Sequence, residues 1–574
     1  MMQTAVAQES PIASEKGHPK GLSVLFATEM WERFNFYGMR ALLTLFLVNA
    51  LAFSEKQSSI MYGGFLGLCY LTPMLGGYIS DRYLGNRNCI ILGGFTMGIG
   101  QLLMVLSGSL YDTHLPTAKL IVWLALFVII IGNGFFKPNI SSMVGQLYPK
   151  NDNRLDSAFT IFYMGINMGA FLGMSICPIL GDVKIEATGV RIVSAFKWGF
   201  LAASIAMFLG TILFYFLKDK YVVTPAGQAI GGKPDFSKST GANTNGEADK
   251  AKFTTNAIFG VVALLAVLFV GIHYLSLSDD HDVIKEWVYP FIYASGISLA
   301  VLILTDKSIT KIERQRITVI YFVAFFVIFF WACFEQAGSS LTFIADYQTD
   351  RRLFGWDMPP SLVQNANSIF IIVFALPFSW LWVKLQKRNL EPVSPVKQSL
   401  GLALLAFGFL IIAWQMKSLG ANEKLGVSWL ILMYLFHTLG ELCLSPIGLS
   451  LVAKLAPHRF SSLLMGVWFL ANAAGYALAG TLGALLPPTM DKFALATKNG
   501  IDLKGILDGT ITATAQQLDT LKTLKLDAHY PTFAGFTIHN LYEFFMVFVI
   551  LPGAAAVLLF LSSGFLKKWM NGVR

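Results

Sequence analysis

The chain has 574 residues, of which 55% are hydrophobic and only 13% are charged, and its mean hydropathy is +0.59. A soluble globular protein carries about 25% charged residues, so this composition excludes a soluble protein and predicts an all-α polytopic membrane protein. The formal net charge of +9 is explained by basic cytoplasmic loops, so we expect the lipid bilayer and no nucleic acid as a partner.

A hydropathy window of about 19 residues predicts fourteen membrane-spanning helices. They lie near residues 22–51, 59–80, 88–110, 118–144, 156–180, 194–217, 253–274, 287–305, 316–345, 361–384, 398–417, 427–453, 461–486 and 540–566. Residues 1–20 lack an apolar core, so we expect no cleavable signal peptide. The short loops on one side of the membrane hold more Lys and Arg than those on the other, and such an excess marks the cytoplasmic side. This predicts a multi-pass protein of the cytoplasmic (inner) membrane with both termini cytoplasmic.

The order of these helices suggests two halves. Residues 218–252 are rich in Gly, Ser, Thr, Asn and charge, which predicts a flexible cytoplasmic linker after a first six-helix bundle in 1–217. A helix pair in 253–305 follows, which we expect to be peripheral and packed in lipid, and then a second six-helix bundle in 306–574. Residues 487–539 form an external loop, with a short helix expected around Thr514–Leu526. Six plus six is typical of transporters with a site between two repeated halves.

The first predicted span carries Glu29, Glu32 and Arg33 within an otherwise apolar run. A charge at the centre of a bilayer costs roughly 2.5–3.5 kcal/mol on insertion scales. Glu29 and Arg33 lie one helical turn apart, so they can neutralise each other in a purely structural ion pair. We favour the other interpretation, an ionisable site on a substrate or proton pathway. The face that they share also carries Phe36, Tyr37 and Arg40.

The rest of the first half holds further polar groups. Lys137 lies in the fourth span before Pro138, and requires either an acidic partner or a wet cavity unless it snorkels to the interface. Asn167 follows Tyr163 by one turn in the fifth span, where such groups either join helices or bind substrate. Asp81 and Arg82 lie in a predicted cytoplasmic loop, 76–87, which resembles the signature loop of the major facilitator superfamily and implies a conformational role.

The second half contributes carboxylates. Glu335 lies within a predicted span, and Glu441 lies one turn before Ser445 in another. A buried carboxylate that has no partner tends to take up a proton, so membrane carboxylates are natural proton carriers. His437 is interpreted as a packing residue. Cations in the first half and anions in the second would suit a zwitterion whose two charged ends meet opposite halves.

Several motifs together carry a family resemblance. They are Glu29-Met30-Trp31-Glu32-Arg33-Phe34-Asn35-Phe36-Tyr37-Gly38, Gly134-Phe135-Phe136-Lys137-Pro138-Asn139, Phe162-Tyr163-Met164-Gly165-Ile166-Asn167 and Gly440-Glu441-Leu442-Cys443-Leu444-Ser445-Pro446. With these motifs the chain resembles the proton-dependent oligopeptide transporters of the major facilitator superfamily, in their bacterial form with fourteen helices. The resemblance implies the major facilitator fold and proton-driven uptake of di- and tripeptides by alternating access. It implies protons as the coupling ion and no cofactor, and we expect a monomer.

The resemblance also implies roles for individual residues. Arg33 and Lys137 would hold the peptide carboxylate, and Glu441 its amino terminus. Glu29, Glu32 and Glu335 would couple to protons by exchanging salt bridges with Arg33 and Lys137. The remaining implied substrate-binding residues are Tyr37, Tyr70, Asn167, Trp331, Asn365, Ser445 and Trp468.

Two departures and three alternatives stay open. Phe36 replaces the first tyrosine of the family's tyrosine pair, and Gly63-Gly64 stands where mammalian members carry a histidine. A transporter of nitrate or another small anion is one alternative, although an anion needs no partner such as Glu441. A peptide-sensing receptor is the second. An enzyme is the third, but the sequence shows no nucleophile–base pair, and its five cysteines lie in or beside apolar runs with no metal-binding spacing.

Overall fold

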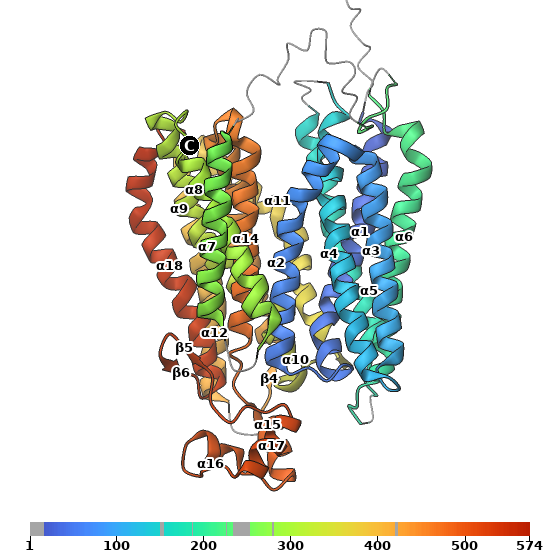
Figure 1. Ribbon diagram of the computed structural model, residues 1–574, viewed down its shortest axis with the longest axis vertical. Helices are drawn as coiled ribbons and strands as arrows, with labels where there is room; N and C mark the ends of the chain where they lie inside the picture. Colours follow the sequence, from blue (N-terminus) through green and yellow to red (C-terminus); the bar gives the residue numbers. More distant parts are fainter. Residues whose placement is uncertain are drawn as a thin grey trace, which may run out of the picture.

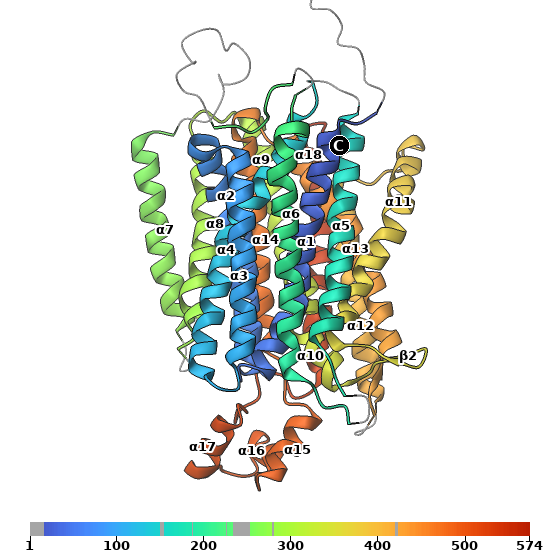
Figure 2. The same ribbon diagram turned by 90° about the vertical axis from the view of Figure 1, so that its right-hand side faces the viewer.

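The computed structural model describes residues 17–149, 154–185, 188–224, 227–233, 253–277, 281–419 and 423–573. Figure 1 shows two bundles of long helices side by side, with α1, α3, α4, α5 and α6 in one bundle and α9, α12, α14 and α18 in the other. Helix α1 begins and α18 ends at the same face, which we call the terminus face. Three short helices, α15 to α17, cover the opposite face, which we call the α15–α17 face (Figures 1 and 2).

The first bundle follows the predicted order. Its helices are α1 (Lys20–Asn49), α2 (Glu55–Ile79), α3 (Asn86–Leu110), α4 (Leu115–Gln146), α5 (Leu155–Gly181) and α6 (Phe196–Tyr221), the last preceded by a 3₁₀ turn at Val193–Ala195. The predicted loop at 76–87 is wrong in one respect, because α2 continues as a π-helix over Ser80–Leu84. Only Gly85 separates it from α3, so the connection is a tight turn.

The inserted pair and the second bundle follow. Their helices are α7 (Thr255–Ser276), α8 (Tyr289–Leu304) after a π-helical turn at Ile284–Val288, α9 (Lys311–Phe334), α10 (Ser340–Tyr347), α11 (Ala366–Lys387), α12 (Ser394–Ser418), α13 (Val427–Leu455), α14 (Ser461–Gly483) and α18 (Leu541–Trp569), with 3₁₀ turns at Glu335–Gly338, Pro360–Asn365 and His458–Phe460. The predicted span at 316–345 is therefore interrupted, because α9 ends at Phe334 and Glu335 opens the 3₁₀ turn.

Thirteen of the described helices are long and apolar enough to span a membrane. Helix α1 is not among them, although it has 30 residues, because its charges lower its hydropathy. It lies within the first bundle beside the others (Figure 1). Together with α1, the described helices therefore match the fourteen predicted spans.

The remaining elements lie outside the bundles. Short helices α15 (Met490–Lys498), α16 (Leu503–Leu507) and α17 (Ala515–Thr523) form a small subdomain with its own apolar core. Helix α17, which Thr514 caps, is the short helix expected around Thr514–Leu526. The strands are two residues each: β1 (Thr349–Asp350) pairs in parallel with β4 (Leu425–Gly426), and β2 (Arg352–Leu353) with β3 (Trp356–Asp357) and β5 (Thr532–Phe533) with β6 (Phe536–Thr537) form hairpins.

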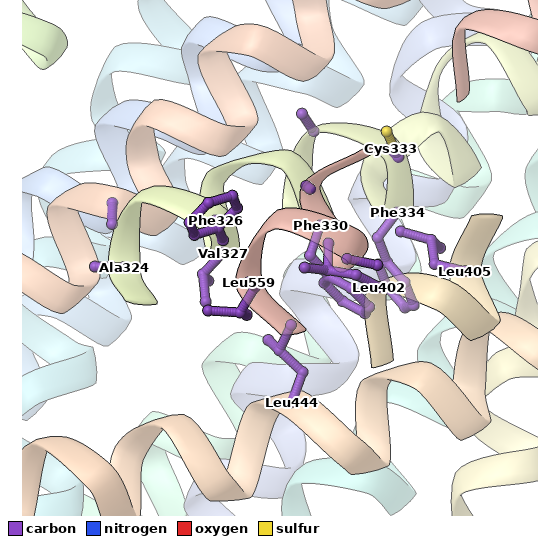
Figure 3. Close-up of a cluster of buried hydrophobic side chains, with 14 of the residues drawn as sticks. Ala324, Phe326, Val327, Phe330, Cys333, Phe334, Leu402, Leu405, Leu444 and Leu559 are labelled. Atoms are coloured by element: carbon purple, nitrogen blue, oxygen red, sulfur yellow. The ribbon is translucent and has the colours of Figure 1, made fainter. Parts of the chain in front are cut away.

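Two large apolar clusters make up most of the core. The larger cluster in the second bundle joins α9, α12, α13 and α18, and Figure 3 shows Phe330 of α9 and Leu402 of α12 within it. The two bundles meet where α2 packs against α14. A Cβ atom on Gly63 would lie 2.7 Å from the Gly480 Cα, so glycine at this position lets the two helices approach closely. The other cluster is not confined to the first bundle, because Ile292 of α8 and Leu470 and Tyr476 of α14 also belong to it.

The prediction that the inserted pair is peripheral and packed in lipid holds for α7 but not for α8. Helix α7 has no buried residue, which fits a helix surrounded by lipid. Helix α8 differs, because it packs against α14 and α2, with Ile292 fully buried near Gly67.

The predicted linker at 218–252 is wrong in its first part. Arg87 of α3 forms an ion pair with Asp219 at 2.6 Å and donates to the Ile230 and Val222 carbonyl oxygens, both at 2.5 Å. Val222 and Ile230 are buried, so residues 218–224 and 227–233 pack on the bundle instead of forming a free linker. The prediction for 234–252 lies outside the described residues.

Candidate functional site

A cavity of about 260 Å³ lies between the two bundles. Helices α1, α2, α4 and α5 line it from the first bundle, and α9, α11, α13 and α14 line it from the second. It brings together most of the residues that the sequence predicted for a site. These are Tyr37, Tyr70, Lys137, Asn167, Trp331, Glu335, Glu441, Ser445 and Trp468. Arg40, Tyr163, Asn367, Tyr434 and Tyr476 also line the cavity, without having been assigned a site role from the sequence.

Arg33 does not line this cavity. Its Nε lies 2.9 Å from the Glu29 Oε1 and 2.5 Å from the Glu32 Oε2, and all three side chains are buried. Helix α5 comes close at this point because Gly169 has no Cβ, which would lie 2.8 Å from the Arg33 Cβ. The guanidinium is therefore occupied by two carboxylates and is not available to a ligand in this conformation.

Glu335 joins the two bundles through a partner that the sequence analysis did not assign. Its carboxylate pairs with the Arg40 Nη1 at 3.1 Å and accepts a hydrogen bond from the Tyr62 hydroxyl at 3.1 Å. The expected exchange of Glu335 with Arg33 and Lys137 is therefore not the pairing seen here. Arg40 lies seven residues after Arg33 on the same helix face, and this spacing was the signal that could have identified it.

Lys137 and Arg40 both line the cavity, but Arg40 is paired with Glu335. The Lys137 Nζ lies 3.5 Å from the centroid of the Tyr70 ring, within the range of a cation–π interaction, and it has no carboxylate partner within ion-pair distance among the described residues. An ammonium in this position can bind a negatively charged group that enters the cavity.

Glu441 lines the cavity from the second bundle, as does Glu335, which is paired with Arg40. The Glu441 Oε2 accepts a hydrogen bond from the Asn367 amide at 3.1 Å, and the same amide donates to the Thr438 hydroxyl at 2.9 Å. Ser445 lies one turn further along α13 and also lines the cavity. The amide fixes the position of the carboxylate but supplies no opposite charge, so Glu441 can receive a cationic group.

Asn365 is not where the sequence analysis expected it. Its amide donates to the Phe171 carbonyl oxygen at 3.2 Å and to the Ser175 hydroxyl at 2.8 Å, and it does not line the cavity. It joins the start of α11 to α5, whereas Asn367 occupies the position facing the cavity. A role for Asn365 in substrate binding stays a prediction for another conformation.

Aromatic rings form much of the cavity wall. Trp331 contacts Tyr476 with ring centroids 5.8 Å apart, and Tyr476 in turn contacts Tyr70 at 4.7 Å. Trp468 is 3% exposed and packs on α13 near Gly448. Asn167 donates to the Tyr163 carbonyl oxygen at 2.9 Å, so its amide oxygen is left for a ligand.

The cavity is closed toward the α15–α17 face by ion pairs between the bundles. Asp346 of α10 accepts Lys184 at 2.5 Å and Arg191 at 2.8 Å, both from the connection between α5 and α6. Burial lowers the pKa of Lys184, although Asp346 acts in the opposite direction. Burial also opposes the charge of Arg191, but Asp182 and Asp346 outweigh this effect and raise its pKa. Asp182 further accepts the Ser361 hydroxyl at 2.7 Å, which completes the closure.

The cavity is open toward the terminus face. A second cavity of about 740 Å³ shares Tyr163, Glu441 and Ser445 with the first, and continues between α11 and α13 to Glu391 and Lys454 near the terminus face. The conformation is thus closed at the α15–α17 face and accessible from the terminus face.

Asp81 and Arg82 lie apart from this site. Both are exposed, and Arg82 donates to the Tyr78 hydroxyl at 3.2 Å. Their conformational role stays a prediction. No group of His, Cys, Asp and Glu residues that could hold a metal ion occurs within the described ranges, and the five cysteines are free and buried.

Comparison with known proteins identifies the family. The sequence model of the POT family matches residues 87–498. The chain belongs to the POT family. Among its relatives in this family, the uncharacterized transporter YclF of Bacillus subtilis (strain 168) is 34% identical over 485 residues, which is 83% of this chain and 90% of the relative.

Two further POT-family matches carry names that describe a ligand. Peptide transporter YePEPT of Yersinia enterocolitica is 32% identical over 475 residues, 81% of this chain and 88% of the relative. The crystal structure of a POT family transporter in complex with a thioalcohol conjugated peptide matches 98% of this chain and 99% of its own, with a TM-score of 0.71 and 27% identity. The family consists of transporters and not enzymes, and the predicted major facilitator fold is confirmed.

Proposed function

We propose that this POT-family member is a proton-coupled symporter that takes up di- and tripeptides by alternating access. The observation that carries the proposal is the charge arrangement of the cavity. Lys137 faces it from the first bundle, and Glu441 faces it from the second. The peptide-transporting relatives and the peptide-bound structure of similar fold support the same substrate class.

A short peptide matches this arrangement because it is a zwitterion. Its carboxylate meets Lys137, and its ammonium group meets Glu441, whose position is fixed by Asn367. Hydrogen bonds to charged groups are worth about 1.5–3 kcal/mol each, so the two ends supply affinity and orientation. Aromatic walls around Trp331 and Tyr70 leave the side chains of the peptide less constrained.

Proton coupling rests on the carboxylates that hold arginines. Protonation of Glu29 or Glu32 removes a charge that holds Arg33, and the freed guanidinium then joins Lys137 at the peptide carboxylate. In the conformation accessible from the terminus face, both carboxylates hold Arg33 again, which fits a state after the release of the ligand and the proton. Protonation of Glu335 in the same way releases Arg40 and weakens closure at the α15–α17 face.

The proposal also includes the location of the protein, its orientation, its oligomeric state and its coupling ion. The protein lies in the cytoplasmic (inner) membrane with both termini cytoplasmic, so that the terminus face opens inward. It works as a monomer, since one chain supplies both sides of the cavity. Protons are the coupling ion, and no cofactor is needed.

Uptake by proteoliposomes tests the substrate class. Purified protein is reconstituted, a pH gradient and a membrane potential are imposed, and the uptake of labelled di-alanine is measured. Unlabelled di-alanine should compete with the label, whereas nitrate at the same concentration should not. Competition by nitrate alone would indicate that the substrate is a small anion and not a peptide. Saturable binding without uptake would indicate a receptor.

A further inference from the structure

A third cavity, separate from the two described above, lies at the α15–α17 face. It has a volume of about 610 Å³ and is lined by the start of α2, by α4, by the turn before α8 and by α17. In Figure 2, α17 lies below the lower ends of α4 and α8, at this face. The cavity therefore joins the two segments that the transport site does not use, which are the inserted helix pair and the 487–539 loop.

Lysines dominate the charge of this cavity. The lining includes Lys56, Lys285, Lys522 and Lys525 against the carboxylates Asp282 and Asp527. Asp282 already accepts the backbone N–H groups of Ile284 and Lys285, each at 3.0 Å.

Among the described lining residues, the four lysines outnumber the two carboxylates. Lys285, Lys522 and Lys525 form no ion pair with a described carboxylate. Lys119 of α4 stands beside them, with its Nζ 4.6 Å from the centroid of the Phe53 ring, and the charge of Lys525 acts on it. Like charges gathered in this way repel one another, so an anion placed among them would be bound favourably.

Apolar side chains continue from the lysines into the membrane. Trp123 lines the cavity one turn after Lys119 on α4, on the side of the bilayer core. It is 39% exposed, and Leu124 beside it is 50% exposed. Val283, before α8, also lines the cavity and is 64% exposed. Tryptophan is typical of the level where lipid headgroups meet the hydrocarbon.

We propose that this cavity binds the headgroup of an anionic phospholipid from the leaflet at the α15–α17 face. The phosphate diester lies among Lys285, Lys522 and Lys525, and the acyl chains follow the exposed apolar side chains of α4 and α8. A soluble anion would use the lysines but not Trp123 or the membrane-facing side chains. The lipid bridges α2 and α4 of the first bundle to α17 of the second, and this role does not depend on which substrate the protein transports.

Native mass spectrometry of the full chain in detergent tests this site. Phosphatidylglycerol and phosphatidylcholine with identical acyl chains are titrated separately, so that only the headgroup charge differs. Each lysine near a membrane surface contributes to anionic lipid binding by about fivefold. The variant Lys522→Gln/Lys525→Gln should therefore bind phosphatidylglycerol about 10- to 25-fold more weakly, with little change for phosphatidylcholine. Unchanged thermal unfolding in detergent without added lipid shows that the variant is folded.

A matched control variant removes the same number of positive charges as the test variant but alters no residue that lines the cavity. Lys498→Gln/Lys504→Gln removes two exposed lysines of the same subdomain that do not line the cavity, and it should keep wild-type affinity. Equal weakening in this control would overturn the site, as would equal affinity of the wild type for the two lipids. Displacement of phosphatidylglycerol by millimolar inorganic phosphate would identify a site for soluble anions and overturn the lipid assignment.

Discussion

The pairing of Glu441 with the peptide ammonium group can be measured by combining one variant with one modified ligand. The variant Glu441→Gln keeps the shape and the hydrogen bond to Asn367 but removes the negative charge. The modified ligand is N-acetylated di-alanine, which keeps the carboxylate but has no ammonium group. Binding of both ligands to both proteins gives four dissociation constants.

The structure sets the expected magnitude. The Glu441 carboxylate accepts a hydrogen bond from the Asn367 amide and forms no ion pair with a described residue. The ammonium group of the peptide would therefore be its cationic partner. A hydrogen bond between charged groups is worth about 1.5–3 kcal/mol, which corresponds to about 10- to 150-fold in affinity. Wild-type protein should lose this amount when the peptide is acetylated, and Glu441→Gln should lose the same amount for free di-alanine.

The decisive quantity is the coupling between the two changes. Acetylation should cost the Glu441→Gln protein almost nothing further, because the interaction is already gone. Isothermal titration calorimetry or intrinsic tryptophan fluorescence supplies the constants. If the two losses are additive, the carboxylate and the ammonium group act independently, and the assignment of Glu441 is refuted.

Three further predictions concern conformational coupling and stability. Glu335→Gln mimics the protonated carboxyl and weakens the pair with Arg40, so gradient-driven accumulation of di-alanine should be lost while exchange across proteoliposomes is kept. Asp346→Asn removes the carboxylate that pairs with both Lys184 and Arg191, and breaking such buried ion pairs costs about 3–5 kcal/mol. In that variant, the thiol introduced by Gln364→Cys should react faster with an impermeant thiol reagent added from the α15–α17 side. Arg87→Ala should lower the free energy of unfolding by about 2–4 kcal/mol, because it removes the contacts that hold the segment after α6 on the bundle.

Each of these has a control in the same region. Glu313→Gln lies at the start of α9 and should leave accumulation intact, and Asp350→Asn is exposed and should leave the thiol reaction unchanged. Arg82→Ala should have little effect on stability, since Arg82 contacts only an exposed tyrosine. Loss of exchange in Glu335→Gln, no change in Asp346→Asn, or equal melting of Arg87→Ala and wild type would each contradict the corresponding argument.

The helices and most site residues could be predicted because hydropathy and buried charge are properties of single segments. Which residue pairs with which across the bundles could not, since Arg40 meets Glu335 only once two helices from different halves are packed. The two asparagines show the limit in detail. Asn365 ends a 3₁₀ turn and Asn367 lies in the first turn of α11, so the change of helix type decides which one faces the cavity.

Two further differences have a similar origin. The break after Phe334 has no proline to mark it, and it depends on the contacts of Glu335 with α1 and α2. The segment after α6 has the composition of a free linker, yet Arg87, more than 130 residues earlier, reaches its carbonyl groups. Composition alone does not contain such long-range contacts.

Accumulation of labelled di-alanine against its own concentration gradient tests the central claim most directly. One proton carried inward across 100 mV supplies about 2.3 kcal/mol, which allows roughly 50-fold accumulation of a neutral peptide at that potential. We predict that proteoliposomes energised by a membrane potential and a pH gradient concentrate the peptide above the external level and release it when a protonophore is added. Equilibration to equal concentrations on both sides, with or without the gradient, would contradict proton-coupled peptide symport.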